Sequence, residues 1–188
     1  MSSNVQSSLN RLKWQKQTEK LKPRPQSGLP FLGKIPTILG KLLYDTTVYI
    51  DILQDHFPAG GDAVIRGVDA YHSTVTEAEL IFAIGRLDPK HPETAENTKK
   101  ISAVIDKRPT HRTLSPDESI WRDAGTMTGM LTRLQGYSGP DRQRLLNDAL
   151  IFCTARKFGL TVLTRNIHDF DLLQQLDTAG KVLFYERK

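Results

Sequence analysis

The stretch that decides the fold is LLYDTTVY, residues 42–49, an apolar run interrupted by a single carboxylate, Asp45. A short apolar run rich in β-branched and aromatic residues predicts a buried strand, and here the strand leads into a helix near residues 49–56. Asp45 then lies at or near the carboxyl end of this first strand. A carboxylate in that position needs a partner, because burying an unpaired charge is costly.

Short apolar runs alternate with longer segments of helical period along the rest of the chain. The pattern predicts strands over 71–76, 160–164 and 182–185, a short extended segment near Thr113, and helices over 77–87, 92–107, 116–134 and 140–158. Gly60 and Gly61 are expected to break the chain. Alternating strands and helices are typical of an α/β fold with a largely parallel sheet.

The basic charge of the protein is concentrated before residue 41. The chain has 188 residues, 38% of them hydrophobic, and this length and composition fit one globular domain. Its formal net charge is +5. Residues 1–40 contain seven Lys or Arg and one acid, so they carry +6 and the remainder about −1. We therefore expect a basic, Pro-containing extension over 1–40, partly disordered or forming a short helix, and one domain over 41–188.

Apolar run lengths and cysteine content indicate the compartment. The longest apolar run is far shorter than the roughly 20 residues that cross a bilayer, and no apolar signal segment follows the N-terminus. The single cysteine, Cys153, cannot form an intramolecular disulfide or a Cys-rich zinc site. We therefore expect a cytoplasmic protein without a membrane segment.

Two more acids interrupt apolar segments. Asp148 shares the apolar stripe of the helix over 140–158, because Leu145, Ile151 and Phe152 lie three or four positions away. Asp169 follows the strand over 160–164 after a short loop. The carboxyl edge of a parallel sheet is where ligands bind, so both acids are candidates for a site.

Each of these acids also has a structural explanation. Asp45 would cap a helix, Asp148 would pair with Arg122 or Arg144, and Asp169 would be an acid of a first helical turn. Three acids at one edge nevertheless repel one another, and a divalent cation with oxygen ligands relieves that repulsion. Such a site needs no histidine, so the five histidines are interpreted as surface or packing residues.

A fourth acid follows the second strand, but the residues leave two candidates, Glu77 and Glu79. They are about 200° apart around a helix and cannot both face one pocket. Periodicity slightly favours Glu77, because three apolar residues share its side. Thr76 and Glu79 match a capping box, which would give Glu79 a purely structural role. The residues alone do not decide between the two.

Four segments together resemble one family: YDTTV at 44–48, STVTEAEL at 73–80, LNDALI at 146–151 and VLTRNIHDF at 162–170. They resemble the PIN-domain nucleases, most closely the VapC-type toxins of type II toxin–antitoxin systems, from about Leu42 to the C-terminus. The resemblance implies a PIN-like three-layer α/β/α fold with a central, mostly parallel sheet of four to five strands. The basic extension departs from the pattern, because most such toxins lack it.

The resemblance also implies a site and an activity. The catalytic and metal-binding acids carried over are Asp45, Glu79, Asp148 and Asp169, with Thr47, Thr164 and Asn166 as supporting residues. The resemblance thus selects Glu79 over Glu77. The implied activity is that of a Mg²⁺-dependent endoribonuclease that hydrolyses RNA phosphodiester bonds, with Mn²⁺ as an alternative ion. A divalent ion suits this chemistry because it activates water and neutralises the leaving oxygen.

The expected partners are an RNA substrate and a cognate antitoxin protein. We also expect a homodimer, because the helices predicted over 77–87 and 92–107 carry more apolar surface than one side of a small sheet covers. The alternative interpretation is a catalytically silent member of the fold that binds RNA or protein. Metal-dependent thermal stabilisation discriminates the two, since a ligand that binds only the folded state raises its stability.

Overall fold

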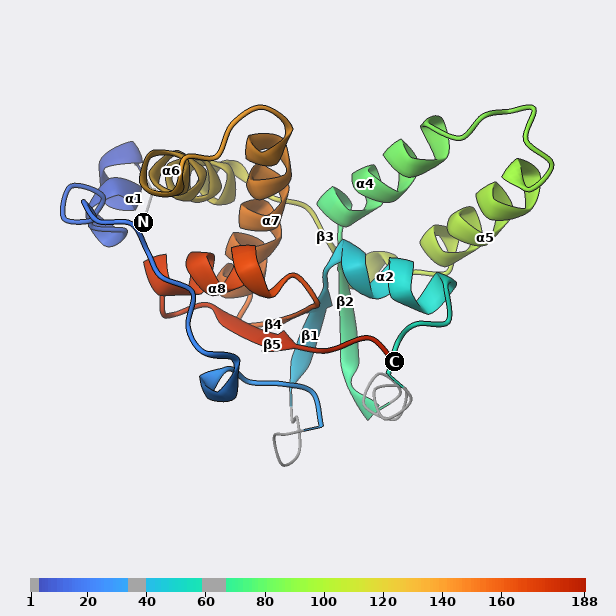
Figure 1. The fold of residues 1–188 in the computed structure, drawn as a ribbon, viewed down its shortest axis with the longest axis horizontal. Coiled ribbons are helices and arrows are strands. Elements are labelled where there is room, and N and C mark those ends of the chain that lie inside the picture. The colour runs from blue at the N-terminus through green and yellow to red at the C-terminus, as the bar shows by residue number, and fades with distance from the viewer. Residues whose placement is uncertain (1–3, 34–39, 59–66) are drawn as a thin grey trace.

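The computed structural model describes residues 4–33, 40–58 and 67–188. At its centre is a five-stranded parallel sheet with the strand order β3-β2-β1-β4-β5 (Figure 1). The strands are β1 (Lys41–Tyr44), β2 (Asp69–Ser73), β3 (Thr113–Leu114), β4 (Thr161–Thr164) and β5 (Lys181–Phe184). This sheet confirms the predicted α/β fold. The predicted chain break at Gly60 and Gly61 lies outside the described residues.

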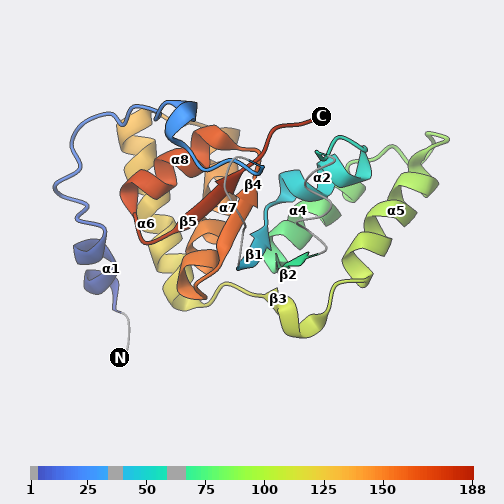
Figure 2. The same ribbon diagram turned by 90° about the horizontal axis from the view of Figure 1, so that it is seen from below.

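Helices cover both faces of the sheet, with α6, α7 and α8 on one side and α2, α4 and α5 on the other (Figure 2). The helices are α1 (Val5–Arg11), α2 (Thr46–Leu53), α4 (Thr74–Gly85), α5 (Thr94–Asp106), α6 (Glu118–Gln135), α7 (Pro140–Lys157) and α8 (Ile167–Leu176). Leu43 and Val162 belong to the first core, whereas their neighbours Leu42 and Leu163 belong to the second. Successive strand residues point to opposite faces, so the molecule has the three layers expected.

Short 3₁₀ turns occur at Gln26–Gly28 and Thr110–Arg112, the second directly before β3. Within residues 4–33, 40–58 and 67–188, no helix is long and apolar enough to cross a membrane.

Helix α2 begins earlier than the apolar run predicts. Strand β1 ends at Tyr44, and the next turn of chain is already helical from Thr46. The β-branched residues there fit a strand by propensity, but the Asp45 side chain accepts a hydrogen bond from the Thr47 backbone N–H and caps the helix. The prediction of a strand over 42–49 is therefore wrong in its second half, and Asp45 lies just past the end of β1.

Helix α4 also begins three residues before its predicted start. Its N-cap is Ser73, whose side-chain oxygen accepts a hydrogen bond from a backbone N–H of the first turn at 3.1 Å. Thr76 lies inside the helix, and its hydroxyl donates to the last carbonyl of β1 at 3.4 Å. The capping-box interpretation of Thr76 and Glu79 is therefore wrong, and Glu79 has no capping role.

The described part of the basic extension packs against the domain. It contains the predicted short helix, α1, and it buries Leu12, Leu29 and Phe31 in the core that α6, α7 and α8 share. Backbone hydrogen bonds of 2.7 and 2.8 Å join the segment around Phe31 to Phe184 of β5. Residues 4–33 are therefore not a solvated tail. The division of the chain into an extension and a domain at residue 40 stays a prediction.

Ion pairs also hold the extension in place. Arg24 Nε lies 2.5 Å from Oδ1 of Asp171, a buried carboxylate on α8. Arg11 Nη2 lies 2.7 Å from Asp123 of α6, and Arg11 also pairs with Asp177 after α8. Part of the positive charge of the extension is thus neutralised within the chain itself.

Candidate metal centre

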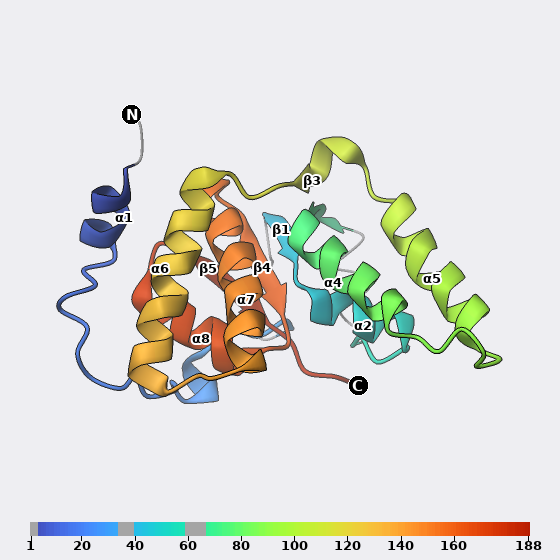
Figure 3. The same cartoon turned by 90° about the horizontal axis from the view of Figure 1, so that it is seen from above.

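The four predicted acids meet at the carboxyl-terminal edge of the sheet. Asp45 directly follows β1, and Asp169 lies in the first turn of α8, just after β4. The strand order reverses between β1 and β4, and ligands of open α/β sheets bind at such a switch point. Asp148 on α7 and Glu79 on α4 complete what we call the acidic cluster. All four line one cleft of about 1290 Å³. Residues of α4 and α7 contribute to its lining, and Figure 3 shows these two helices near each other on the sheet.

Asp45 is held by two threonine hydroxyls. Thr47 Oγ1 and Thr164 Oγ1 each donate to Asp45 Oδ2 at 2.7 Å, and the Thr164 hydroxyl accepts the Asn166 backbone N–H at 2.9 Å. Asp45 is only 2% exposed. Burial raises the pKa of its carboxyl group, and the hydrogen bonds from the two hydroxyls act against that rise. The three residues predicted to support the site therefore lie in it.

Asn166 links two members of the acidic cluster. Its Nδ2 amide donates at 3.0 Å both to Asp148 Oδ2 and to Asp169 Oδ2. Burial raises the pKa of Asp148 well above its usual value, and the charges of Asp45, Asp169 and Glu79 raise it further. Repulsion from all three acids at Asp148 shows that the cluster is one electrostatic unit.

Asp169 differs from the other members, because its pKa is lowered. Burial alone would raise it, but hydrogen bonds from Tyr137, Asn166 and His168 outweigh burial. The Tyr137 hydroxyl donates to Asp169 Oδ1, and His168 Nδ1 lies 2.9 Å from the same oxygen. Asp169 is thus the member of the cluster that best retains its negative charge.

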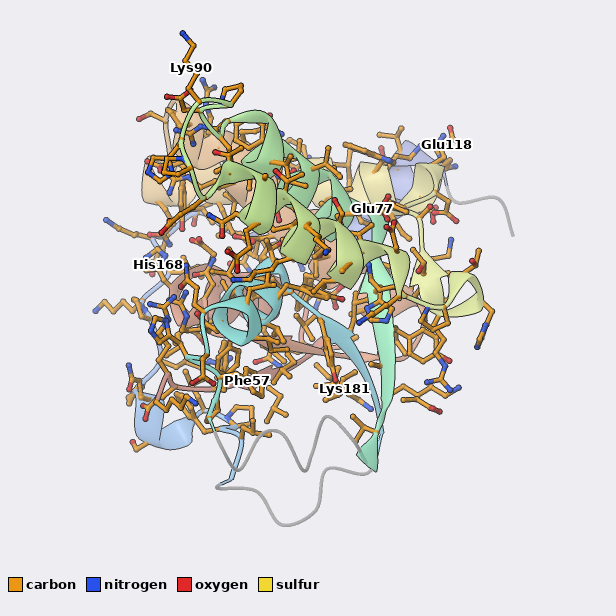
Figure 4. The ribbon with its side chains drawn as sticks, turned by 90° about the vertical axis from the view of Figure 1, so that its right-hand side faces the viewer. Phe57, Glu77, Lys90, Glu118, His168 and Lys181 are labelled. Carbon is orange, nitrogen blue, oxygen red and sulfur yellow. The ribbon has the colours of Figure 1, made fainter. Side chains whose placement is uncertain are left out.

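The fourth acid in the cleft is Glu79, and Glu77 lies elsewhere. The Thr46 hydroxyl donates to Glu79 Oε2, and the Asn147 amide donates to Oε1 at 2.8 Å. Burial raises the pKa of Glu79, these hydrogen bonds act against the rise, and the charge of Asp45 adds to it. Glu77 instead lies 3.4 Å from the Arg108 guanidinium. Figure 4 shows Glu77 well apart from His168, which contacts the cluster.

Periodicity favoured Glu77, but the structure places Glu79 in the cleft. The periodicity prediction required the apolar residues on the Glu77 side of α4 to face the core. Leu80 is buried, but its neighbour Ile81 is 51% exposed. The apolar stripe of α4 therefore does not mark the face that lines the cleft.

Comparisons with known proteins address the fold. No protein-family profile matches this chain, and no curated protein sequence matches it either. Several solved structures do. VapBC2 from Rickettsia felis, bound to a DNA fragment from its promoter, is 16% identical, with a TM-score of 0.55 over 78% of this chain and 98% of that chain. DNA-bound VapBC from Salmonella typhimurium is 20% identical, with a TM-score of 0.55 over the same shares of the two chains.

FitAcB from Neisseria gonorrhoeae is 21% identical, with a TM-score of 0.56 over 76% of this chain and 96% of that chain. Nearly the whole length of each matched chain is therefore covered, and the TM-scores above 0.5 indicate a shared fold. The chain has the fold of VapC-type PIN domains. The PIN-like fold also accounts for the place of the acidic cluster, because the strand order sets the switch point between β1 and β4.

A buried acid outside the cluster shows how this PIN-like fold treats a structural carboxylate. Asp51 of α2 is fully buried and accepts hydrogen bonds from Arg165 Nε and Arg187 Nε, both at 2.7 Å, and from the Tyr185 hydroxyl at 2.8 Å. Cations and hydrogen bonds thus compensate its charge, and its pKa is lowered although burial alone would raise it. Within the acidic cluster, by contrast, the charged contact found among the described residues joins Asp169 to His168, a side chain that is exposed.

The acidic cluster has the donor chemistry that Mg²⁺ prefers, which is carboxylate oxygens with room for water. The oxygens are not yet arranged as a ligand set. Within the described part of the chain, no three Asp, Glu, His or Cys side chains are placed to hold a metal ion as they stand. Thr46 and Asn147 hold Glu79, and Tyr137 holds Asp169.

The sequence analysis missed several residues that position the cluster. Thr46 and Asn147 bind Glu79, and Tyr137 and His168 bind Asp169. Thr46, Asn147 and His168 had a signal in the sequence, since each stands directly next to a predicted site residue. Tyr137 had none, because it reaches the cluster from the loop between α6 and α7. His168 is a surface residue, as predicted for the histidines, but its Nδ1 also lies 2.9 Å from the Asp169 carboxylate.

Proposed function

We propose that this protein is a Mg²⁺-dependent endoribonuclease and the toxin of a toxin–antitoxin pair, with Mn²⁺ as an alternative ion. The observation that carries the proposal is the acidic cluster, in which four carboxylates from four separate segments converge in one cleft. Such a cluster is destabilising without a cation, because burial and mutual repulsion both disfavour its charged form. The PIN-like fold supports the proposal, because VapC-type toxins share it.

Within this proposal each member of the acidic cluster has a role. Asp45 and Asp148 are the direct metal ligands, since Asp45 is fixed by the Thr47 and Thr164 hydroxyls and Asp148 faces the other three acids. Glu79 and Asp169 complete the site, directly or through water. When bound, a divalent cation would supply Lewis acidity and activate a water molecule for attack on phosphorus.

The remaining residues of the site hold the carboxylates for that task. Asn166 spans Asp148 and Asp169, so one amide sets the separation of two acids. Tyr137 and His168 hydrogen-bond the Asp169 carboxylate and lower its pKa, which favours its charged form. These contacts position the acids before the substrate arrives, which reduces the cost of assembling the site.

The partners follow from the same likeness and are part of the proposal. The similar chains come from VapBC and FitAcB structures, which favours a cognate antitoxin that blocks the cleft. An Arg or Lys of such a partner would compete with the metal for the carboxylates. For a homodimer, Ile101, Val104 and Ile105 pack on the second core of this chain. Ile81 of the same predicted surface is 51% exposed, which leaves it available to a second subunit.

The decisive experiment compares wild type with Asp148→Asn on an RNA substrate in Mg²⁺, with EDTA as the metal-free control. We expect wild type to cleave only with metal, and the variant to fold but not cleave, because the substitution removes one anionic ligand at almost constant volume. Circular dichroism of both proteins controls for folding. Equal cleavage by the two proteins at the same Mg²⁺ concentration would show that the cluster is not the active site.

The second candidate is a catalytically silent PIN-fold module that binds RNA or protein. The hydrogen bonds that already hold Glu79 and Asp169 within the protein favour it. Thermal melting separates the two functions. A metal site that binds only the folded state raises stability by about 2.7 kcal/mol at a hundred times its dissociation constant. The silent module would melt at the same temperature with and without Mg²⁺ or Mn²⁺.

A further inference from the structure

Two large aromatic side chains are exposed on the rim of the cleft that holds the acidic cluster. Phe82 of α4 is 65% exposed and Trp121 of α6 is 51% exposed, and both line the cleft. Neither ring is needed by the cores on the two faces of the sheet. Exposed aromatic rings at the rim of a polar cleft indicate an interaction site more strongly than scattered apolar residues do.

The two aromatic residues lie on different sides of the acidic cluster. On the α4 wall, Phe82 follows Glu79 by three residues, which is about 4.5 Å along the helix axis away from the sheet. On the opposite wall, Arg144 precedes Asp148 by four residues, about one helical turn. The two walls meet where the Asn147 amide donates to Glu79 at 2.8 Å. Phe82 and Arg144 thus form the outer end of the cleft beyond the cluster.

Trp121 belongs to the other end of the cleft. It stands in the first turns of α6, which packs along α7, and it shares the cleft lining with Leu150 of α7 and Pro116 before α6. Leu150 follows Asp148 by two residues, whereas Arg144 precedes it. The acidic cluster therefore lies between Trp121 at one end of the cleft and Phe82, with two arginines, at the other.

The charges at the outer end are those that a phosphate backbone requires. Arg86 lies over the Phe82 ring at 5.6 Å from its centroid. Arg144 on the facing wall is largely exposed to solvent and pairs with Asp141 at 3.0 Å. An aromatic ring beside an arginine is the arrangement by which proteins hold an unpaired base and its phosphate.

We infer that Trp121 and Phe82 are stacking platforms for the bases on either side of the scissile phosphate, and that Arg86 binds the backbone at the Phe82 end. The substrate is then a single-stranded RNA segment, because a base must be unpaired to stack on a protein ring. This inference rests on the proposed nuclease function and adds the residues of this chain that would hold the RNA. It names substrate-positioning residues, which touch the RNA away from the bond that breaks.

The placement of both rings in one cleft favours RNA over a second protein chain as the occupant. A protein interface over Phe82 would tolerate Arg86, because aromatic and arginine side chains are both common at such interfaces. It would leave Trp121 unexplained, however, since that ring is on a different helix. RNA accounts for both rings and for the basic residue with one ligand.

The test measures binding of a fluorescein-labelled single-stranded oligoribonucleotide of mixed sequence by fluorescence anisotropy, in EDTA so that no cleavage is needed. Trp121→Ala and Phe82→Ala are each expected to weaken binding by about 5- to 150-fold, while Trp121→Phe retains most of the affinity. Phe158→Ala is the matched control, because Phe158 is 49% exposed but lies outside the cleft lining, and it should bind like wild type.

The salt dependence separates stacking from charge. Arg86→Gln should reduce the slope of log affinity against log salt by about 0.7, whereas Trp121→Ala should lower affinity with the slope unchanged. A purely structural role for Trp121 would not give this pattern. Wild-type affinity in both alanine variants, or an equal loss in Phe158→Ala, would overturn the inference. A Phe82→Ala variant that turns a dimer into a monomer without losing RNA affinity would assign Phe82 to a protein interface instead.

The same measurements keep this inference separate from the proposed function. RNA that binds with the expected variant pattern but stays uncut in Mg²⁺ would support the stacking platforms and contradict the nuclease. RNA that is cut by wild type, with KM unaffected by Trp121→Ala and Phe82→Ala, would support the nuclease and contradict the platforms.

Discussion

Replacing Phe31 by alanine tests whether the N-terminal extension belongs to the folded unit. The Phe31 side chain is 2% exposed, and its ring centroid lies 5.9 Å from that of Phe184 in β5. The substitution removes this buried ring and leaves a cavity, which costs about 3–5 kcal/mol in a well-packed core. The substitution changes only the side chain and leaves the backbone groups that bond to β5 in place.

Urea unfolding followed by circular dichroism measures the loss. With an m-value of about 2 kcal/mol/M, the midpoint should fall by about 2 M urea. Val5→Ala is the control within the same extension, because Val5 is 59% exposed, and it should change stability by less than about 0.5 kcal/mol. A loss below about 1 kcal/mol for Phe31→Ala would refute the packing of the extension. Deletion of residues 1–40 is then a poor test of RNA binding, because it removes part of the core.

Three further predictions concern the site, the pH dependence and the assembly. Glu79→Gln should lower Mg²⁺-dependent RNA cleavage by about tenfold or more, whereas Glu77→Gln should leave the rate unchanged; the opposite pattern would show that the register of α4 is misassigned. Burial and the charge of Arg108 lower the pKa of His72 to about 4. Between pH 6.5 and pH 4 the unfolded chain therefore protonates this histidine while the folded protein keeps it neutral. The free energy of unfolding is unaffected above pH 6.5 and falls by roughly 3 kcal/mol as the pH drops to 4. Urea titrations of wild type and His72→Gln across this range should diverge by that amount, and parallel curves would refute the assignment. Light scattering should give a mass near twice 21.2 kDa, with Ile81→Asp monomeric; a wild-type monomer at tens of micromolar would contradict the dimer.

The sequence determined the class of fold and the location of the acids. Apolar runs separated by helical segments specify a parallel α/β sheet, because each run can be buried only between two layers of helices. The predicted segments 92–107, 116–134 and 140–158 agree with α5, α6 and α7 to within about two residues. Asp45, Asp148 and Asp169 stood out because each interrupts an apolar segment or follows one after a short loop. That property can be read along the chain without knowing what packs against it.

Only the tertiary structure decided which residues face the cleft. Glu77 and Glu79 are separated by helix rotation, and the rotation of α4 is set by contacts with other segments, such as that between Asn147 and Glu79. Tyr137 reaches Asp169 from a loop distant in sequence, and Phe31 finds its burial against β5. Periodicity describes how residues of one segment lie relative to each other. It does not describe which neighbour each face meets, and the site and the packed extension both depend on that pairing.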